Sequence, residues 1–166
     1  MGSINPAWLQ RLRHKRGFGV HSPFAFRFIT EFLNPPRGYR YYCEQDCPSA
    51  DIRIVERLRA NFCPKNEIYA GKRAVKISGR TDNDGLDFEN ADFIVIDLQT
   101  IDRNDELVRR IERGNDLVVL AFNHNRRRLA PLLKAMPSGM CFRNARSKAV
   151  LVINQKLPRQ DFWVKW

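Results

Sequence analysis

The hydrophobic positions of the chain follow two different patterns. Up to about residue 62 apolar residues recur at the spacing of an amphipathic helix, and after it they gather in short runs that alternate with helical segments. Helices are predicted over residues 5–16, 23–33, 50–62, 104–113 and 126–135. Strands are predicted over residues 66–70, 73–78, 92–98, 117–122, 140–144 and 149–154.

This alternation of strands and helices predicts an α/β fold. A strand, a helix and the next strand form a right-handed βαβ unit, which builds a parallel sheet. The last two strands follow each other without a helix, so they are expected to pair antiparallel. The predicted fold is a Rossmann-like three-layer sandwich with a mainly parallel sheet, an antiparallel C-terminal edge pair and an N-terminal helical arm. The arm and its loop span residues 1–48, and the α/β domain spans residues 49–166.

Composition places the chain among globular proteins. It has 166 residues, of which 43% are hydrophobic and 28% charged, which is enough apolar material for a packed core. No apolar run approaches the roughly 20 residues that cross a bilayer, so no membrane partner is expected. The N-terminus lacks the basic and apolar segments of a secretory signal, and four cysteines are too few for a disulfide scaffold. A cytoplasmic location with reduced thiols is expected.

The net charge of +11 leaves two interpretations open. The basic residues lie in several clusters along the chain, and such clusters form either a solvated surface or a face that binds a polyanion. On the second interpretation the chain is a nucleic-acid-binding module. The residues expected to contact phosphates are Arg11, Arg13, Lys15, Arg16, Arg126, Arg127 and Arg128.

Two polar residues follow predicted strands and are candidates for chemistry. Asp97 ends a buried strand at the edge where α/β sheets bind ligands, although aspartate is also a common turn or capping residue there. His124 follows the next strand and is either a general base or part of an ordinary polar turn. Gly71 follows the first strand, but the strand-like pattern of residues 73–78 argues against a phosphate-binding turn before a helix. The spacing of the cysteines and histidines predicts no metal site.

One segment near the start contains a motif that is specific enough to indicate a resemblance to a known family. Residues 17–24, Gly-Phe-Gly-Val-His-Ser-Pro-Phe, are similar to the Gly-x-Gly-(Ile/Val)-His-Ser-Pro-Phe opening of class I S-adenosylmethionine-dependent methyltransferase-like proteins of Bacteroidetes. Residues 57–68 resemble the step into the family's first strand, 91–97 and 116–122 its fourth and fifth strands, and 160–166 its closing segment. The resemblance implies a Rossmann-like fold and S-adenosylmethionine as cofactor. By position it implies cofactor contacts from Glu67, Gly71 and Asp97, and catalytic roles for Asp97 and His124.

The chain also departs from this family in the cofactor site. The family's first strand ends in a glycine-rich turn that receives the methionine part of the cofactor, whereas Tyr69 stands here at the first glycine and would block that approach. The stretch between Gly71 and Asp92 is too short for the usual helix, second strand and next helix, and it lacks the acidic residue that binds the ribose. Gln99 and Thr100 stand where the family tends to have a histidine. The cofactor site is therefore expected to be degraded.

These observations predict a divergent, truncated methyltransferase-like protein without catalytic activity, a pseudoenzyme that acts by binding or as a scaffold. Its partner would be a second copy or another protein, held by the aromatic residues of the N-terminal arm. Two alternatives stay open: an active methyltransferase with an atypical cofactor site, and the basic nucleic-acid-binding module. The aromatic residues of the arm are Trp8, Phe18, Phe24, Phe26, Phe28 and Phe32.

Overall fold

The protein forms two compact units, seen in a computed structural model. Unit 1 contains residues 1–61 and 162–166, and unit 2 contains residues 62–161. The helix predicted at residues 5–16 and the four basic residues within it lie outside the described part of the chain. The structure describes residues 22–35, 47–79, 87–101 and 105–166.

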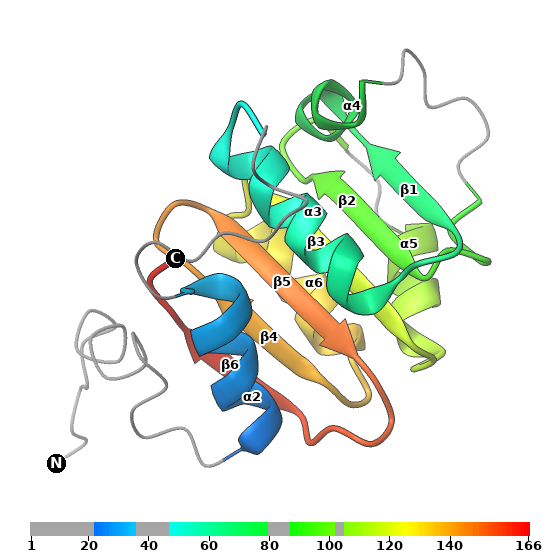
Figure 1. Ribbon diagram of the computed structural model, residues 1–166. Coiled ribbons are helices and arrows are strands. Elements are labelled where there is room, and N and C mark those ends of the chain that lie inside the picture. Colours follow the sequence, from blue (N-terminus) through cyan, green and yellow to red (C-terminus); the bar gives the residue numbers. More distant parts are fainter. Residues whose placement is uncertain (1–21, 36–46, 80–86, 102–104) are drawn as a thin grey trace, which may run out of the picture. The chain divides into compact units, whose positions relative to one another are not determined.

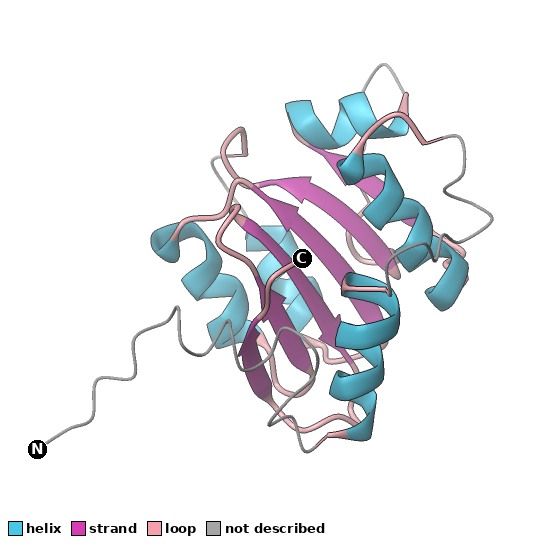
Figure 2. Ribbon diagram, turned by 60° about the vertical axis from the view of Figure 1, so that its left-hand side comes forward, coloured by secondary structure: helices cyan, strands magenta, loops and turns pink. Residues whose placement is uncertain are grey.

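Helices and strands alternate through most of the described chain (Figures 1 and 2). The helical elements are α2 (Pro23–Arg27), the π-helical η1 (Phe28–Leu33), α3 (Ala50–Phe62), α4 (Lys72–Ser78), α5 (Asp105–Glu112) and α6 (Arg126–Ala135). The strands are β1 (Glu67–Ala70), β2 (Phe93–Asp97), β3 (Leu117–Phe122), β4 (Met140–Arg143), β5 (Lys148–Ile153) and β6 (Gln160–Trp163).

Unit 1 is held together by polar contacts between its helices and the chain end. The hydroxyl of Ser22 accepts a backbone hydrogen bond from the first turn of α2 at 3.3 Å, so this residue is the N-cap that its sequence context predicts. The guanidinium of Arg57 on α3 donates to the carbonyl of Phe32 at 2.7 Å. The amide of Asn34 donates to the carbonyl of Lys165.

The aromatic residues of α2 and η1 pack largely on one another. The ring centroids of Phe24 and Phe28 are 5.8 Å apart, and those of Phe28 and Phe32 are 5.7 Å apart. Phe28 is buried, and Phe26 is the one exposed large hydrophobic residue in the described part of the chain, at 45%. The prediction that these aromatic residues bind a partner stays a prediction.

The sheet has six strands in the order β1-β2-β3-β5-β4-β6 (Figure 1). β2 is parallel to both β1 and β3, whereas β5 is antiparallel to both β3 and β4. The predicted α/β fold with an antiparallel C-terminal strand pair is confirmed. That pair does not form the edge, because β6 lies beyond β4. Only Phe162 is buried in β6, so this four-residue strand has too short an apolar pattern to be predicted.

One predicted strand is a helix. Residues 73–78 were expected to form a short strand, but they belong to α4. In a segment this short, the same residues also fit a helical face, and Ala74 is the position that α4 buries. Gly71 and Gly79, both with positive φ angles, bound the helix at its two ends.

α5 and α6 cover one face of the sheet, behind the strands in the view of Figure 1. Alternate strand residues point to this face, as the period of a β-strand requires. Burial of these side chains removes apolar surface from water and is the main favourable term for folding of unit 2. Members of this core include Ile68, Ile94, Ile96, Val119, Leu151, Leu107, Ile111, Leu129 and Leu132.

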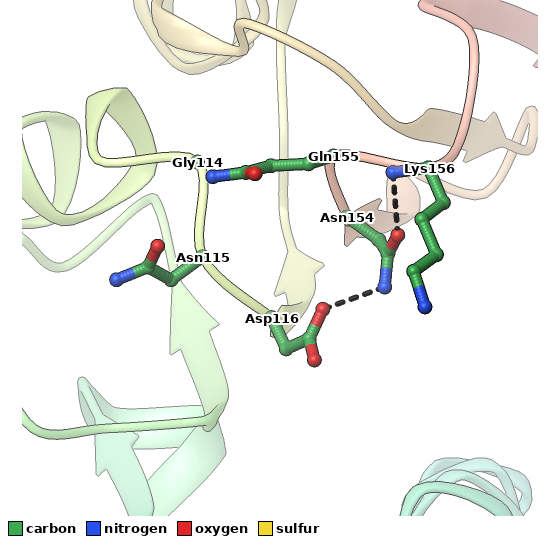
Figure 3. A pocket seen from close by; sticks show the side chains of 6 residues that line it. All are labelled: Gly114, Asn115, Asp116, Asn154, Gln155 and Lys156. Atoms are coloured by element: carbon green, nitrogen blue, oxygen red, sulfur yellow. Dashed lines mark hydrogen bonds between the residues drawn. The ribbon is translucent and has the colours of Figure 1, made fainter.

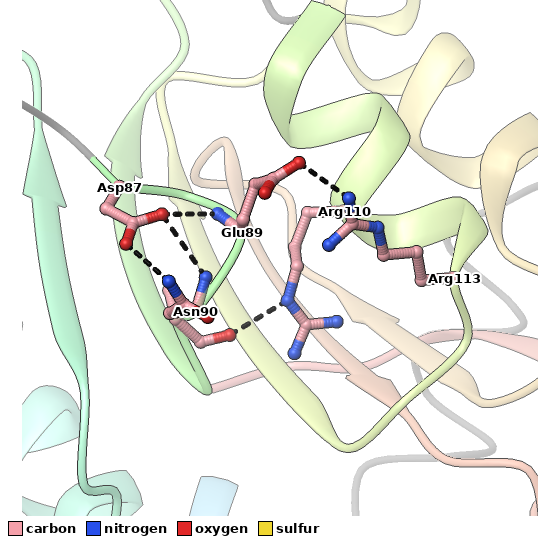
Figure 4. A network of polar contacts seen from close by, with 6 residues as sticks. Asp87, Glu89, Asn90, Arg110 and Arg113 are labelled. Carbon is pink, nitrogen blue, oxygen red and sulfur yellow. Dashed lines mark hydrogen bonds and ion pairs between the residues drawn. The ribbon is translucent and has the colours of Figure 1, made fainter.

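A buried arginine fixes α5 against the starts of two strands (Figure 4). The Nε of Arg110 donates to the carbonyl of Ala91 at 2.9 Å, and its Nη2 donates to the carbonyl of Asp116 at 3.2 Å. Nearby, Arg113 forms an ion pair with Glu89 at 2.6 Å. Because burial disfavours the charged form, the pKa of Arg110 is lowered.

A glycine permits close approach of backbone at the start of β4. Gly139 has a φ of 113°, and a Cβ at this residue would lie 2.2 Å from the carbonyl oxygen of Val152. Its N–H donates to the carbonyl of Leu157 at 3.2 Å, and its carbonyl accepts from the N–H of Gln160 at 3.1 Å. No side chain fits here without a backbone shift.

Candidate functional site

The carboxyl ends of β1, β2 and β3 meet at one edge of unit 2. Gly71 follows β1, Asp97 ends β2 and Asn123 follows β3. Asp97 is in register with Phe122, so the last residues of the neighbouring strands lie side by side. This is the edge at which parallel α/β sheets bind their ligands.

The turn between β1 and α4 is closely packed on the end of β2. Gly71 has a φ of 89°, and a Cβ there would lie 2.4 Å from Oγ1 of Thr100 and 2.9 Å from Cβ of Asp97. The N–H of Lys72 donates to the same threonine oxygen at 3.2 Å. The glycine therefore allows close approach, but the approaching group is the protein's own side chain and not a ligand.

The carboxylate of Asp97 is buried, at 3% exposed, and accepts three hydrogen bonds. Its Oδ2 accepts from the N–H of Arg73 at 3.2 Å, in the first turn of α4. Its Oδ1 accepts from the N–H of Gln99 at 3.1 Å and from the side-chain amide of Asn123 at 2.8 Å. These three hydrogen bonds use most of the roughly four acceptor sites of a carboxylate. Because the donors lie on α4, shortly after β2 and directly after β3, Asp97 joins three segments of the chain.

Arg73 extends this network along the edge. Its guanidinium donates to Oδ1 of Asn123 at 3.0 Å and lies 4.8 Å from the ring centroid of Phe122. The Nζ of Lys148 lies over the same ring, at 5.8 Å. Both distances are within the range of cation–π attraction. The edge is thus built from polar and aromatic groups that bind one another.

The structure brings together only two of the residues expected at a cofactor site. Gly71 and Asp97 are in contact, but Glu67 lies at the amino end of β1, in register with Phe93, which begins β2. The carboxylate of Glu67 accepts a hydrogen bond from the hydroxyl of Tyr69 at 3.0 Å. Glu67 is therefore placed at the opposite edge from Asp97.

His124 does not hydrogen-bond to the Asp97 network. Its backbone N–H donates to the carbonyl of Ser147 at 3.1 Å, and its Nε2 lies 3.2 Å from the carbonyl of Lys148. Burial lowers the pKa of His124, and the hydrogen bond to Lys148 opposes that shift with a smaller effect. Asn123 turns the chain between the two candidates with a φ of 52°.

Sequence reasoning missed Arg73, Thr100 and Asn123. Because residues 73–78 were predicted as a strand, the first turn of α4 was not expected. The backbone N–H of Arg73 in that turn, which donates a hydrogen bond to Asp97, was therefore missed. Asn123 was treated only as a neighbour of His124. An asparagine directly after a buried strand is the signal that could have found it, because asparagine tolerates the positive φ of a tight turn.

The three arginines that begin α6 have different surroundings. Arg126 and Arg127 are exposed, whereas the partly buried Arg128 donates from its guanidinium to the carbonyl of Leu98. The backbone N–H of Arg128 also donates to the side chain of Asn125 at 2.9 Å, which caps the helix. Arg128 is therefore a structural residue.

A second cluster of titratable groups lies on β4 and β6. Arg143 forms a two-point ion pair with Asp161, in which its Nε lies 2.9 Å from Oδ1. Burial raises the pKa of Asp161 in spite of this partner. Burial also raises the pKa of the Cys141 thiol well above its ordinary range, and the charge of Asp161 adds to that shift. A buried protonated thiol is a poor nucleophile, so this cluster is not a catalytic cysteine site.

Two surface hollows lie at the opposite edge of the sheet. The larger, of about 490 Å³, is lined by polar residues, among which Asn154 donates from its amide to Asp116 at 2.6 Å (Figure 3). The second, of about 340 Å³, shares Asp116 and Asn154 and extends to Cys63 and Asp92. Neither contains Asp97 or His124.

Comparisons with family models, with curated proteins and with solved structures give no significant match. Within the described residues, no group of three or more His, Cys, Asp or Glu side chains is arranged to hold a metal ion. The described helices also include none with the length and apolar character needed to cross a membrane.

Proposed function

We propose that this chain is a divergent, truncated methyltransferase-like protein that has lost catalytic activity and acts by binding. The ancestry of the chain is inferred from the opening motif. Its Rossmann-like three-layer arrangement is inferred from the alternation of strands and helices. The described residues add the contacts that the protein makes at the carboxyl edge of β1, β2 and β3.

One observation carries the proposal: the place for a ligand is filled by the protein itself. The turn at Gly71 packs on Thr100, and the Asp97 carboxylate already accepts hydrogen bonds from α4, from Gln99 and from Asn123. A cofactor entering this turn would have to displace these partly buried contacts and leave their donors without partners, which costs free energy. That cost favours a site that no longer binds S-adenosylmethionine.

The direct test is calorimetric titration of the full chain with S-adenosylhomocysteine. The expected result is no heat of binding and no rise in melting temperature at millimolar ligand, because a ligand that binds only the folded state must stabilise it. Stoichiometric binding at micromolar concentration would overturn the proposal in favour of an active methyltransferase with an atypical site.

A pair of glycine variants locates any ligand that does bind. Gly71→Ala fills the turn against Thr100, whereas Gly79→Ala adds a methyl group at a position with open space around it. Loss of binding in the first variant alone would place the ligand at the β1–α4 turn. Equal binding in both would place it elsewhere and leave the carboxyl edge filled, as proposed.

A further inference from the structure

Four exposed basic residues lie along the carboxyl edge of unit 2. Lys72 begins α4, Arg126 and Arg127 begin α6, and Arg146 lies in the turn between β4 and β5. In Figure 1 the arrowheads of β1 and β2 point toward the side where α4 begins and where the turn before β5 lies. Within the described part of the chain, none of these four side chains takes part in a hydrogen bond or an ion pair.

The sheet topology separates the charges of unit 2. At the carboxyl edge the described acidic residues are Asp97, which is buried and hydrogen-bonded, Asp161, which is paired with Arg143 at the end of β4, and two residues of the first turn of α5, Asp105 and Glu106. Five acidic residues instead lie at the starts of the parallel strands or in the turn before β2. They are Glu67, Asp87, Glu89, Asp92 and Asp116. One edge is therefore mainly basic and the other is rich in carboxylates.

The basic edge is too long for one small anion. Lys72 follows β1 and Arg146 follows β4, and these strands are separated by four steps in the sheet order. At roughly 4.8 Å for each step, the row spans about 19 Å. A single phosphate group contacts one end of such a row, whereas a chain of phosphates contacts its whole length.

The start of α6 holds charges that the helix itself disfavours. The N-terminus of a helix carries a partial positive charge, so acidic residues are preferred in its first turn. α6 has arginines there and no acidic residue. Only Arg128 has a structural contact, with the carbonyl of Leu98. Residues that oppose local stability without a structural compensation are commonly found at functional sites.

We propose that this basic edge, formed by Lys72, Arg126, Arg127 and Arg146, binds the phosphate backbone of a nucleic-acid strand. This inference rests on the proposed function: if the protein acts by binding, a nucleic-acid strand is its partner. Phosphate contacts from exposed lysine and arginine side chains carry no sequence information, so binding is expected to depend only weakly on sequence. Arg73, Lys148 and Arg128 support the edge through their contacts with Phe122 and Leu98.

The test is fluorescence anisotropy of a labelled oligouridine with the full chain over a range of salt concentrations. With four phosphates neutralised, the logarithm of the binding constant is expected to fall with the logarithm of salt concentration at a slope of about −3 for a single strand. A labelled duplex in parallel separates a preference for single strands from binding of any phosphate backbone.

Two double variants with the same change in net charge make the test specific. Arg126→Glu with Arg127→Glu reverses charge on the basic edge, and Lys65→Glu with Lys156→Glu reverses charge at exposed positions near the hollows of the opposite edge. The first is expected to weaken binding about tenfold or more and to reduce the slope by about 1.4, whereas the second keeps the slope. Unfolding curves of both variants confirm that each is folded.

Binding that weakens equally in both variants would overturn the proposal, because net charge alone would then explain it. No binding to either oligonucleotide would also overturn it, including the case in which the chain binds vesicles of phosphatidylserine and phosphatidylcholine. The two proposals fail separately. Binding of S-adenosylhomocysteine would contradict the lost cofactor site only, and absence of oligonucleotide binding would contradict the partner only.

Discussion

The side-chain amide of Asn123 donates a hydrogen bond to the carboxylate of Asp97, at 2.8 Å, across the ends of two parallel strands. The same asparagine accepts from Arg73 at 3.0 Å, and the same carboxylate accepts from the backbone of Arg73 at 3.2 Å. β3, β2 and the first turn of α4 are thereby tied at one point. A residue with these contacts stabilises the fold whether or not it has any role in chemistry.

Replacement of Asp97 by alanine is expected to lower the free energy of unfolding by about 2–4 kcal/mol. The partly buried hydrogen bonds from Arg73, Gln99 and Asn123 would lose their common acceptor, and donors left without a partner in a partly buried place are costly. Urea denaturation of the variant measures this change. Asp105→Ala, at an exposed aspartate on α5, is the control and is expected to cost less than about 1 kcal/mol. Equal effects would contradict a structural role for Asp97.

Replacement of Gly71 by alanine is expected to cost at least about 3 kcal/mol. The backbone at Gly71, with a φ of 89° and a ψ of 162°, is in a region that only glycine adopts easily, and the new Cβ would also meet Thr100 at 2.4 Å. Gly79→Ala is the matched variant, because Gly79 has a φ of 67° but no atom near the new Cβ, and about 1 kcal/mol is expected. Denaturation of the two proteins side by side tests the difference; similar stabilities would show that the turn is looser than described.

The elements around Asp97 and Gly71 could be predicted from the sequence, whereas the contacts of Asp97 could not. The buried runs of β2 and β3 and the amphipathic pattern of α5 identified these elements, because a short continuous apolar run is typical of a buried strand and a 3.6-residue period is typical of a helix. The role of Asp97 could not be identified, since its donors come from segments up to 26 residues away and one lies in the misassigned α4. Glu67 was placed by motif position, and only strand register shows that it lies at the other end of β1.

Charge reversal at the start of α6 is expected to stabilise the protein. Glutamates at residues 126 and 127 would face the positive end of the helix, so the double variant Arg126→Glu, Arg127→Glu is expected to gain about 1 kcal/mol in total. Lys134→Glu, in the last turn of the same helix, is expected to have the opposite effect. Melting temperatures at low salt measure both changes. Destabilisation by the double variant would mean that these arginines have a structural role.

The half-buried imidazole of His124 is expected to make stability depend on pH. Because burial lowers its pKa from the ordinary value of 6.5, the unfolded chain binds a proton that the folded chain resists. The free energy of unfolding should therefore fall as the pH drops below about 6.5. Asp161, whose pKa is raised by burial, contributes a slope of opposite sign above 3.8. The difference between the wild type and His124→Gln over pH 7 to 5 isolates the histidine, and a flat difference would refute the prediction.

The thiol of Cys141 is expected to resist alkylation in the folded protein. It is 1% exposed, and burial raises its pKa, so little thiolate is present to react. Cys63 is exposed and serves as the internal reference. Iodoacetamide labelling followed by peptide mass spectrometry should modify Cys63 first and Cys141 only in denaturant. Modification of Cys141 at the same rate as Cys63 in native conditions would show that β4 opens readily.

Gly139 has a consequence for the evolution of this chain. The backbone of Val152 lies so close to it that any other residue forces the start of β4 away from β5, and a mutation here would be removed by selection in every descendant that retains the sheet. Surface arginines and even cofactor residues can be lost over time, but this glycine should persist. A glycine immediately before the fourth strand is therefore expected wherever this pairing of β4 with β5 is retained, whatever the protein binds.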